Sequence, residues 1–263
     1  METPFFVIIS LSRCGSTAVH RALNCHDGIR CGFEPDFSDL NWRNSAVVSR
    51  MHELRQKYSG IKHVWDPSGW PFAGVHASSI AEMDRRIEDV RALNIAIMQC
   101  ADRVVHLRRR DRLDRVLSDL LGQQTELWGP AYSDGRISEV DEVVRYRAEL
   151  EVRPVRAIDP EIVDWYLTHV PPLEDEFATI SDDGHYMELE YEELFGPSVV
   201  LEDRLNGYCR ILEFLGFSTA PESWNKSVVE KLFHPRAKLN DASTVGRIPN
   251  LAELRRRFPN NRD

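Results

Sequence analysis

Residues 5–20 read FFVIISLSRCGSTAVH, and this stretch decides the fold that we expect for the chain. Its first part, FFVIIS (Phe5–Ser10), is a continuous apolar run rich in aromatic and β-branched residues, which is typical of a strand buried in a parallel sheet. After a short polar loop, apolar residues recur at helical spacing over 18–23. A strand that turns through such a loop into a helix usually presents backbone N–H groups to an anion.

The loop itself fits neither of two familiar phosphate-handling motifs. A Walker-type loop needs GxxxxGK[ST], in which the lysine reaches the outer phosphates, but here Gly15 is followed directly by Ser16 and Thr17. A cysteine phosphatase places an arginine at the sixth position after its nucleophile, and counting from Cys14 that position is His20. What remains is a loop with a glycine, two hydroxyls and a guanidinium, which suits a phosphate or sulfate held without a metal ion.

A plainer interpretation of this loop stays open. Ser16 or Thr17 would then cap the helix and Gly15 would make the turn, with no ligand involved. Cys14 is expected to be an inert, half-buried thiol rather than a nucleophile, although a helix N-terminus can lower the pKa of a cysteine. On the anion-binding interpretation, Arg13 provides the positive charge.

The composition limits the compartment and the partners that we expect. The chain has 263 residues, of which 42% are hydrophobic, so it can bury a full core. Its formal net charge of -9 disfavours nucleic acid and anionic membranes as partners. Its five cysteines lack CxxC spacing, its first apolar run is too short for a signal peptide, and no stretch approaches the about 20 apolar residues of a membrane span. We therefore expect a cytoplasmic protein without a membrane span.

The rest of the chain alternates between predicted strands and predicted helices. Besides the first pair, strands are predicted at 29–33, 103–107 and 185–191, and helices at 46–58, 78–93, 112–128, 160–176 and 199–216, with Ser78 or Ser79 and Asp111 as N-caps. Residues 64–74 are predicted to form a turn-rich surface loop, residues 129–159 an insertion or lid, and the residues after Pro221 a polar, basic tail with few core positions. This alternation predicts an α/β fold: a P-loop-like, doubly wound parallel sheet flanked by helices, forming a single domain over 1–263.

A second charged segment, VVHLRRRDRLDRVLSDLL (Val104–Leu121), surrounds the start of the helix predicted from 112. Arginines crowd this helix N-terminus at 108–110 and 112, where each cation opposes the helix dipole by ~0.3–1 kcal/mol. A bound anion would reverse the sign of that effect. Ser118 lies eight residues after Arg110 on the same helix, where its hydroxyl could share an anion with that guanidinium.

These two segments together resemble the sulfotransferases that use 3'-phosphoadenosine 5'-phosphosulfate (PAPS). In that family a loop of the R-x-G-[ST]-[ST] kind grips the 5'-phosphosulfate, and RCGST stands in that place. The resemblance implies that the cofactor is held there by Arg13, Cys14, Gly15, Ser16 and Thr17. The family also holds the 3'-phosphate with an arginine and a serine eight residues apart, a pattern that Arg110 and Ser118 match.

Three further segments extend the resemblance. LRRRDRLDRVLSDLLGQQTELW (107–128) is similar to bacterial carbohydrate sulfotransferases of the trehalose-modifying type, and LEYEELFG (189–196) is similar to the family's Y-E-D-L segment. STVGRIPN (243–250) resembles the C-terminal cofactor loop, which implies that Gly246 and Arg247 are further ligands of the 3'-phosphate. GRIPN departs from the aromatic-bearing loop of the family, and it leaves the adenine contacts unassigned.

The resemblance implies transfer of the sulfuryl group from PAPS to a hydroxyl of a sugar or another small metabolite, in line and without a metal, leaving adenosine 3',5'-bisphosphate. Arg13 would stabilise the charge on the departing phosphate. A base must face the loop, and Glu34 in GFEP is expected to be that base, because a neighbouring parallel strand ends at the same edge of the sheet. The plainer alternative is that Glu34 is a surface turn residue before Pro35.

The other candidate residues rank below Glu34. His20 is expected to be structural and His26 to end the first helix, whereas Asp66 and His76 lie in segments that could reach the acceptor. Three tryptophans could stack on a sugar ring or could equally anchor packing: Trp65, Trp70 and Trp128.

Two other functions stay open. The first is a nucleotide-dependent kinase with a divergent P-loop, which would need ATP and magnesium. The second is a non-catalytic, sulfotransferase-like protein that keeps the nucleotide pocket and transfers nothing. On the main hypothesis the partner is a small-molecule acceptor of the carbohydrate kind, and a homodimer is expected on general grounds alone.

Overall fold

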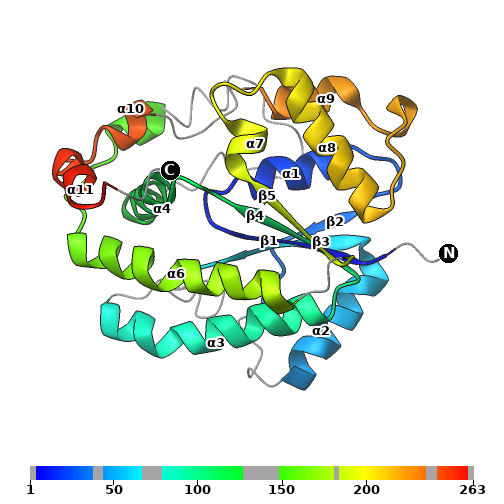
Figure 1. The fold of residues 1–263 in the computed structure, drawn as a ribbon, viewed down its shortest axis with the longest axis horizontal. Helices are drawn as coiled ribbons and strands as arrows, with labels where there is room; N and C mark the ends of the chain where they lie inside the picture. Colours follow the sequence, from blue (N-terminus) through cyan, green and yellow to red (C-terminus); the bar gives the residue numbers. More distant parts are fainter. Residues whose placement is uncertain are drawn as a thin grey trace.

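The computed structural model describes residues 4–37, 44–66, 79–126, 148–180, 184–234 and 242–259, in which strands and helices alternate (Figure 1). The strands are β1 (Phe6–Leu11), β2 (Cys31–Phe33), β3 (Gly60–Trp65), β4 (Arg103–Arg108) and β5 (Tyr186–Glu190). The helices of the first half are α1 (Ser16–Leu23), α2 (Asn44–Lys57), α3 (Ile80–Gln99) and α4 (Arg112–Thr125). Those of the second half are α6 (Pro160–Ile180), α7 (Tyr191–Phe195), α8 (Leu201–Leu215), α9 (Lys226–Leu232), α10 (Ala242–Val245) and α11 (Leu251–Arg257).

The strands form one parallel sheet in the order β2-β3-β1-β4-β5. The central strand is β1, with Phe6 in register with Gly60 of β3 on one side and with Arg103 of β4 on the other. The prediction of an α/β fold with a parallel sheet flanked by helices is confirmed. The chain fills the β2 side of β1 first and then crosses to the β4 side, and ligands of such sheets bind at the carboxyl ends of the strands where the winding reverses.

Helices cover both faces of the sheet (Figure 1). On one face lie α2, α3 and α6, and on the other lie α1, α7, α8 and α9. The N-terminal part of α4 follows the carboxyl end of β4, and α4 packs against α6 and α10. Among the described helices, none is long and apolar enough to cross a membrane.

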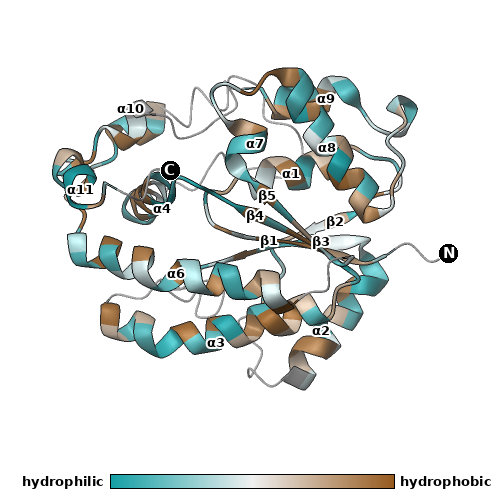
Figure 2. Ribbon diagram, viewed as in Figure 1, coloured by the Kyte–Doolittle hydropathy of each residue, from teal (hydrophilic) through white to brown (hydrophobic). Residues whose placement is uncertain are grey.

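The sheet forms the centre of the hydrophobic core. Every residue of β1 is buried, which explains why this strand has no alternation of apolar and polar residues. Hydrophobic residues run along the central strands in Figure 2, whereas the outer helices carry both hydrophobic and hydrophilic residues. Three predicted helix boundaries are also confirmed: Ser79 and Asp111 accept hydrogen bonds from the backbone N–H groups of Glu82 and Asp114, and Gly216 ends α8 with φ 79°. The ends predicted at 93, 128 and 176 were wrong, because α3, α4 and α6 end at Gln99, Thr125 and Ile180.

The prediction of a surface loop from 64 was wrong at its start, because residues 60–65 form the buried strand β3. The pattern GIKHVW hides this strand, since it places two polar residues in an apolar run. Both are buried in the sheet and hydrogen-bonded: Lys62 donates to Thr17, and His63 pairs with Asn94 at 2.8 Å. Buried polar groups that find such partners do not disrupt a strand.

The prediction of a tail with few core positions was also wrong. Eight hydrophobic side chains after Pro221 are buried: Trp224, Val229, Leu232, Phe233, Val245, Ile248, Leu254 and Phe258. They lie on or beside short helices, so only one or two apolar residues per turn face inward, and the overall composition of the segment stays polar. Of the expected insertion or lid, residues 148–159 are described, and they include a helical turn at 148–152; the remainder lies outside the described residues.

Candidate functional site

The loop that joins β1 to α1 contains two residues in the left-handed backbone region. Arg13 has φ 68° and Gly15 has φ 79°. Glycine is required at position 15, because a Cβ atom there would lie 2.6 Å from Cε2 of Phe195 as well as being strained. Arg13 lacks the freedom of glycine, so its surroundings must hold it in this conformation.

The N-terminus of α1 has no side-chain cap. The helix begins at Ser16, its N-cap is Gly15, and its first turn contains no acidic residue. The alternative in which Ser16 or Thr17 caps the helix was therefore wrong, although Gly15 does make the turn. A helix N-terminus with neither a capping side chain nor an acid of its own has the local chemistry that binds an anion.

Lys62 links this loop to Glu34, the residue that we expected to be the base. The Lys62 side chain is 1% exposed, and its Nζ donates hydrogen bonds to Thr17 Oγ1 at 2.8 Å and to Glu34 Oε1. Glu34 follows β2 and keeps 29% of its side chain exposed, so part of its carboxylate faces outward. The loop, Glu34 and the end of β3 thus meet at the carboxyl edge of the sheet, as the parallel strands predict.

Lys62 was not among the residues singled out in the sequence, although a lysine within an otherwise largely apolar strand is a signal that could have found it. Burial lowers the pKa of Lys62 below its ordinary value, while the adjacent Glu34 carboxylate acts in the opposite direction. The Lys62 Nζ also lies 4.1 Å from the ring centroid of Phe33, which is 55% exposed beside Glu34.

The structure brings Arg13 and Ser118 together, although we had assigned them to different phosphates of the cofactor. Arg13 Nε donates a hydrogen bond to Ser118 Oγ at 3.0 Å. Arg110, whose side chain is 54% exposed, is paired instead with Glu190. An anion shared by Arg110 and Ser118 would require Arg110 to exchange the Glu190 carboxylate for that anion.

Arg109 is one of the arginines expected at the start of α4, and it is a further cation near the loop to which the sequence assigned no ligand. Its guanidinium lies over the ring of Tyr191, 4.9 Å from the centroid. The Tyr191 ring in turn lies 3.2 Å from where a Cβ atom of Gly15 would be. Arg109 Nε is buried and has no hydrogen-bond partner among the described residues. An unsatisfied guanidinium nitrogen beside a helix N-terminus fits an anionic ligand better than it fits a purely structural role.

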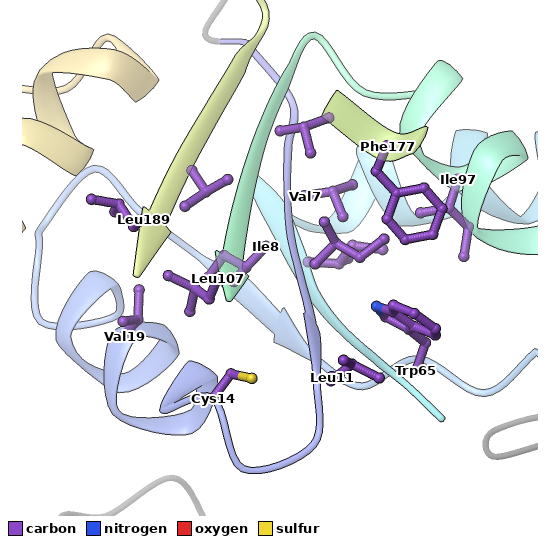
Figure 3. Packing of buried hydrophobic residues seen from close by; sticks show 14 of the residues in the cluster. Val7, Ile8, Leu11, Cys14, Val19, Trp65, Ile97, Leu107, Phe177 and Leu189 are labelled. Atoms are coloured by element: carbon purple, nitrogen blue, oxygen red, sulfur yellow. The ribbon is translucent and has the colours of Figure 1, made fainter. Parts of the chain in front are cut away.

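The Cys14 thiol is not available for chemistry. Its side chain is fully buried rather than half-buried, and it lies within the bend that joins β1 to α1 (Figure 3). Burial raises the pKa of Cys14 to about 12, and this outweighs the opposing effect of Arg115 and Arg109. Cys14 can therefore offer a ligand only its backbone N–H group.

The C-terminal candidates lie close to α4, because α10 packs against that helix. Gly246 is exposed directly after α10. The Arg247 guanidinium donates hydrogen bonds to the carbonyl oxygens of Leu150 and, at 2.6 Å, of Arg153. In this structure Arg247 therefore holds the 148–152 turn against the residues that follow α10.

The two histidines near the first helix have structural partners. His20 Nε2 is hydrogen-bonded to the Cys31 carbonyl at 3.0 Å, and burial together with Lys62 lowers the pKa of His20 to about 4. His26 is buried, lies beyond the end of α1 and bonds to the Ser218 carbonyl at 3.0 Å.

Asp66 and Trp65 are both buried at the end of β3. Asp66 accepts a hydrogen bond from the Tyr166 hydroxyl at 2.9 Å. Trp65 packs against Phe177, with ring centroids 5.4 Å apart, so it anchors the core and cannot stack on a sugar in this arrangement (Figure 3). His76, Trp70 and Trp128 lie outside the described residues.

In the described ranges, no cluster of three or more His, Cys, Asp and Glu side chains has a metal-binding arrangement. Compared with known proteins, the chain matches no model of a protein family and no curated protein.

Proposed function

We propose that the protein is a sulfotransferase that uses PAPS and a P-loop-like segment between β1 and α1 to sulfate a hydroxyl of a small molecule. The observation that carries the proposal is the position of Lys62. Its single ammonium group is hydrogen-bonded both to Thr17 in the first turn of α1 and to the carboxylate of Glu34. An anion-binding loop and a partly exposed carboxylate at one sheet edge are the two parts that sulfuryl transfer to a hydroxyl needs.

The chemistry of the loop fits a phosphosulfate. The uncapped start of α1 supplies backbone N–H groups and the positive end of a helix dipole. Arg13 and Arg109 add guanidinium groups on the α4 side, and Lys62 adds an ammonium group on the β3 side. Bound PAPS would supply the activated sulfuryl group and adenosine 3',5'-bisphosphate as the leaving group.

Different residues of the chain would carry out proton acceptance, charge stabilisation and binding of the 3'-phosphate. Glu34 accepts the proton of the acceptor hydroxyl, because its carboxylate is partly exposed while Lys62 fixes its position. Arg13 and the α1 amides stabilise the negative charge on the departing phosphate. Arg110 gives up its ion pair with Glu190 and holds the 3'-phosphate instead. Gly246 and Arg247 follow α10, which packs against α4, so they lie on the same side of the site as Arg110.

The proposal includes a small hydroxyl acceptor of the carbohydrate kind and a reducing, cytoplasmic setting in a bacterium. All five cysteines are free thiols, which suits such a setting. Phe33 offers an exposed ring directly before Glu34, on which an apolar face of an acceptor could pack.

The test is a transfer assay with radiolabelled PAPS and a panel of mono- and disaccharides. The proposal expects labelled sulfate on a hydroxyl acceptor together with release of adenosine 3',5'-bisphosphate, and it expects both to need the Glu34 carboxylate. A protein that phosphorylates the same panel from ATP and magnesium, without using PAPS, would be a kinase and would overturn the proposal.

A further inference from the structure

Two consecutive residues of the loop are bonded to two consecutive residues of α4. Ser12 Oγ donates a hydrogen bond to Asp119 Oδ1, and Arg13 Nε donates one to Ser118 Oγ at 3.0 Å. Asp119 is only 1% exposed, and its second oxygen accepts a hydrogen bond from Gln123 Nε2 at 3.1 Å. The loop is therefore fastened to a helix that is about a hundred residues away in the sequence.

This attachment occurs where the backbone is strained. Arg13 adopts φ 68°, a conformation that a non-glycine residue keeps only when its surroundings impose it. On the C-terminal side of Arg13, Gly15 has φ 79° and lies so close to Phe195 that a Cβ atom there would come within 2.6 Å of the ring. On the N-terminal side of Arg13, the hydrogen bond from Ser12 Oγ to Asp119 Oδ1 attaches the loop to α4.

Asp119 lies among charged and titratable groups from three sides. Arg13 faces it from the loop, Asp66 from the end of β3 and Tyr166 from α6, and Arg115 lies one turn earlier on α4. Burial, followed by the nearby Asp66, raises the pKa of Asp119 to about 6, while Ser12, Arg115 and Arg13 act in the opposite direction. A carboxylate in such a place needs a role, because burying it costs free energy.

We propose that Asp119 is a positioning residue for the anion loop: through Ser12 it holds Arg13 in the left-handed conformation from which the guanidinium reaches Ser118 and the anion. The identity of that anion as the phosphate end of PAPS rests on the proposed function. The positioning role itself rests on the contacts of Ser12 and Arg13 with α4.

The charge of Asp119 and its hydrogen bond have opposite effects on anion binding. As a negative charge beside Arg13, Asp119 repels an anion, so a purely electrostatic role predicts tighter binding in both Asp119→Asn and Asp119→Ala. A positioning role predicts that Asp119→Ala weakens binding. Asp119→Asn keeps an oxygen that accepts from Ser12, so it retains binding at least as tight as in the wild type.

The experiment measures the affinity of adenosine 3',5'-bisphosphate by calorimetry for the wild type, Ser12→Ala, Asp119→Ala, the double variant and Asp119→Asn. Asp114→Ala serves as the control, because it removes a negative charge from the same helix without touching Ser12. We expect affinity to fall by about tenfold in each alanine variant. We expect the double variant to bind no more weakly than either alanine variant, since both single changes remove the same hydrogen bond between Ser12 and Asp119, and we expect Asp119→Asn to retain binding.

Hydrogen exchange of the amides of 12–17 provides a second readout that needs no ligand. Exchange should rise equally in Ser12→Ala and Asp119→Ala and should stay low in Asp119→Asn. Unchanged or tighter binding in both alanine variants, or unchanged exchange, would overturn the positioning role. If Asp119→Ala does not fold, Ser12→Ala decides by the same criteria. If the wild type binds no bisphosphate, the proposed function fails, and the exchange data alone decide the positioning role.

Discussion

Lys62 Nζ lies 2.8 Å from Thr17 Oγ1 and is also hydrogen-bonded to Glu34, so one buried cation connects β3 with the first turn of α1 and with the residue after β2. This arrangement places the Glu34 carboxylate beside the anion loop, although the two are not neighbours in the sequence. The proposed chemistry depends on it, and each of its parts can be changed separately.

Replacing Glu34 with glutamine should lower sulfuryl transfer by about 10²–10⁴-fold, because the amide cannot accept the proton of the acceptor. Binding of adenosine 3',5'-bisphosphate should stay near the wild-type value, since the amide oxygen can still accept from Lys62. Glu53→Gln, an exposed change on α2, is the matched control. Full activity of Glu34→Gln in a steady-state assay would show that another group is the base.

Replacing Lys62 with methionine should keep the volume of the side chain but release Glu34 and Thr17 from each other. We expect turnover to fall by at least about a hundredfold. The free energy of unfolding should fall, because Glu34 loses its countercharge, while water offsets part of this cost at a Glu34 side chain that is 29% exposed. Lys57→Met, on the exposed end of α2, is the control. Wild-type turnover in Lys62→Met would contradict the role of this residue.

Arg110 should bind the 3'-phosphate of the cofactor and should not contribute to binding of its 5'-phosphate. Arg110→Ala should weaken binding of adenosine 3',5'-bisphosphate by about tenfold or more, while binding of adenosine 5'-monophosphate should change little. Glu190→Gln should act in the opposite direction, since Arg110 no longer has to leave a carboxylate. Titration calorimetry with both nucleotides measures these effects, and an equal loss for both ligands would remove Arg110 from the 3'-phosphate site.

The buried Asp119 carboxyl predicts a pH dependence of stability. Its pKa is raised in the folded state from 3.8 to about 6, so its contribution to stability is present below pH 4 and is lost as the pH rises through 6. Asp119→Asn should therefore be more stable than the wild type at pH 7.5, by on the order of 1–3 kcal/mol, and should lose most of this advantage at pH 4.5. Urea unfolding of both proteins at the two pH values checks this, and an equal difference at both would contradict it.

Much of the fold could be predicted from the sequence, because local chemistry marks most of its elements. The apolar run of β1, the capping residues Ser79 and Asp111 and the C-terminal Gly216 each act within a few residues. The strand β3 could not be read in this way, since its buried Lys62 is stabilised by partners 28 and 45 residues away. Local patterns do not contain such partners.

Of the candidate site, the sequence predicts which segments come together, but it does not predict the partners of individual side chains. The parallel topology places Glu34 and the loop at the same edge, as expected, but β2 is not the neighbour of β1 that we expected, because the unpredicted strand β3 lies between them. The partners of the arginines were not predictable: Arg13 reaches Ser118, and Arg110 reaches Glu190 instead. Ser118 of α4 and Arg110 just before α4 each bond to a residue that is far away in the sequence, so only the folded chain reveals these contacts.

The most direct test of the central claim is the thermal stability of the wild-type protein with adenosine 3',5'-bisphosphate and, separately, with ATP and magnesium. A ligand at a hundred times its Kd adds about 2.7 kcal/mol to the free energy of unfolding. We predict a clear rise in Tm with the bisphosphate and a much smaller one with ATP and magnesium at equal concentration. A rise with ATP and magnesium, and none with the bisphosphate, would contradict the assignment as a sulfotransferase.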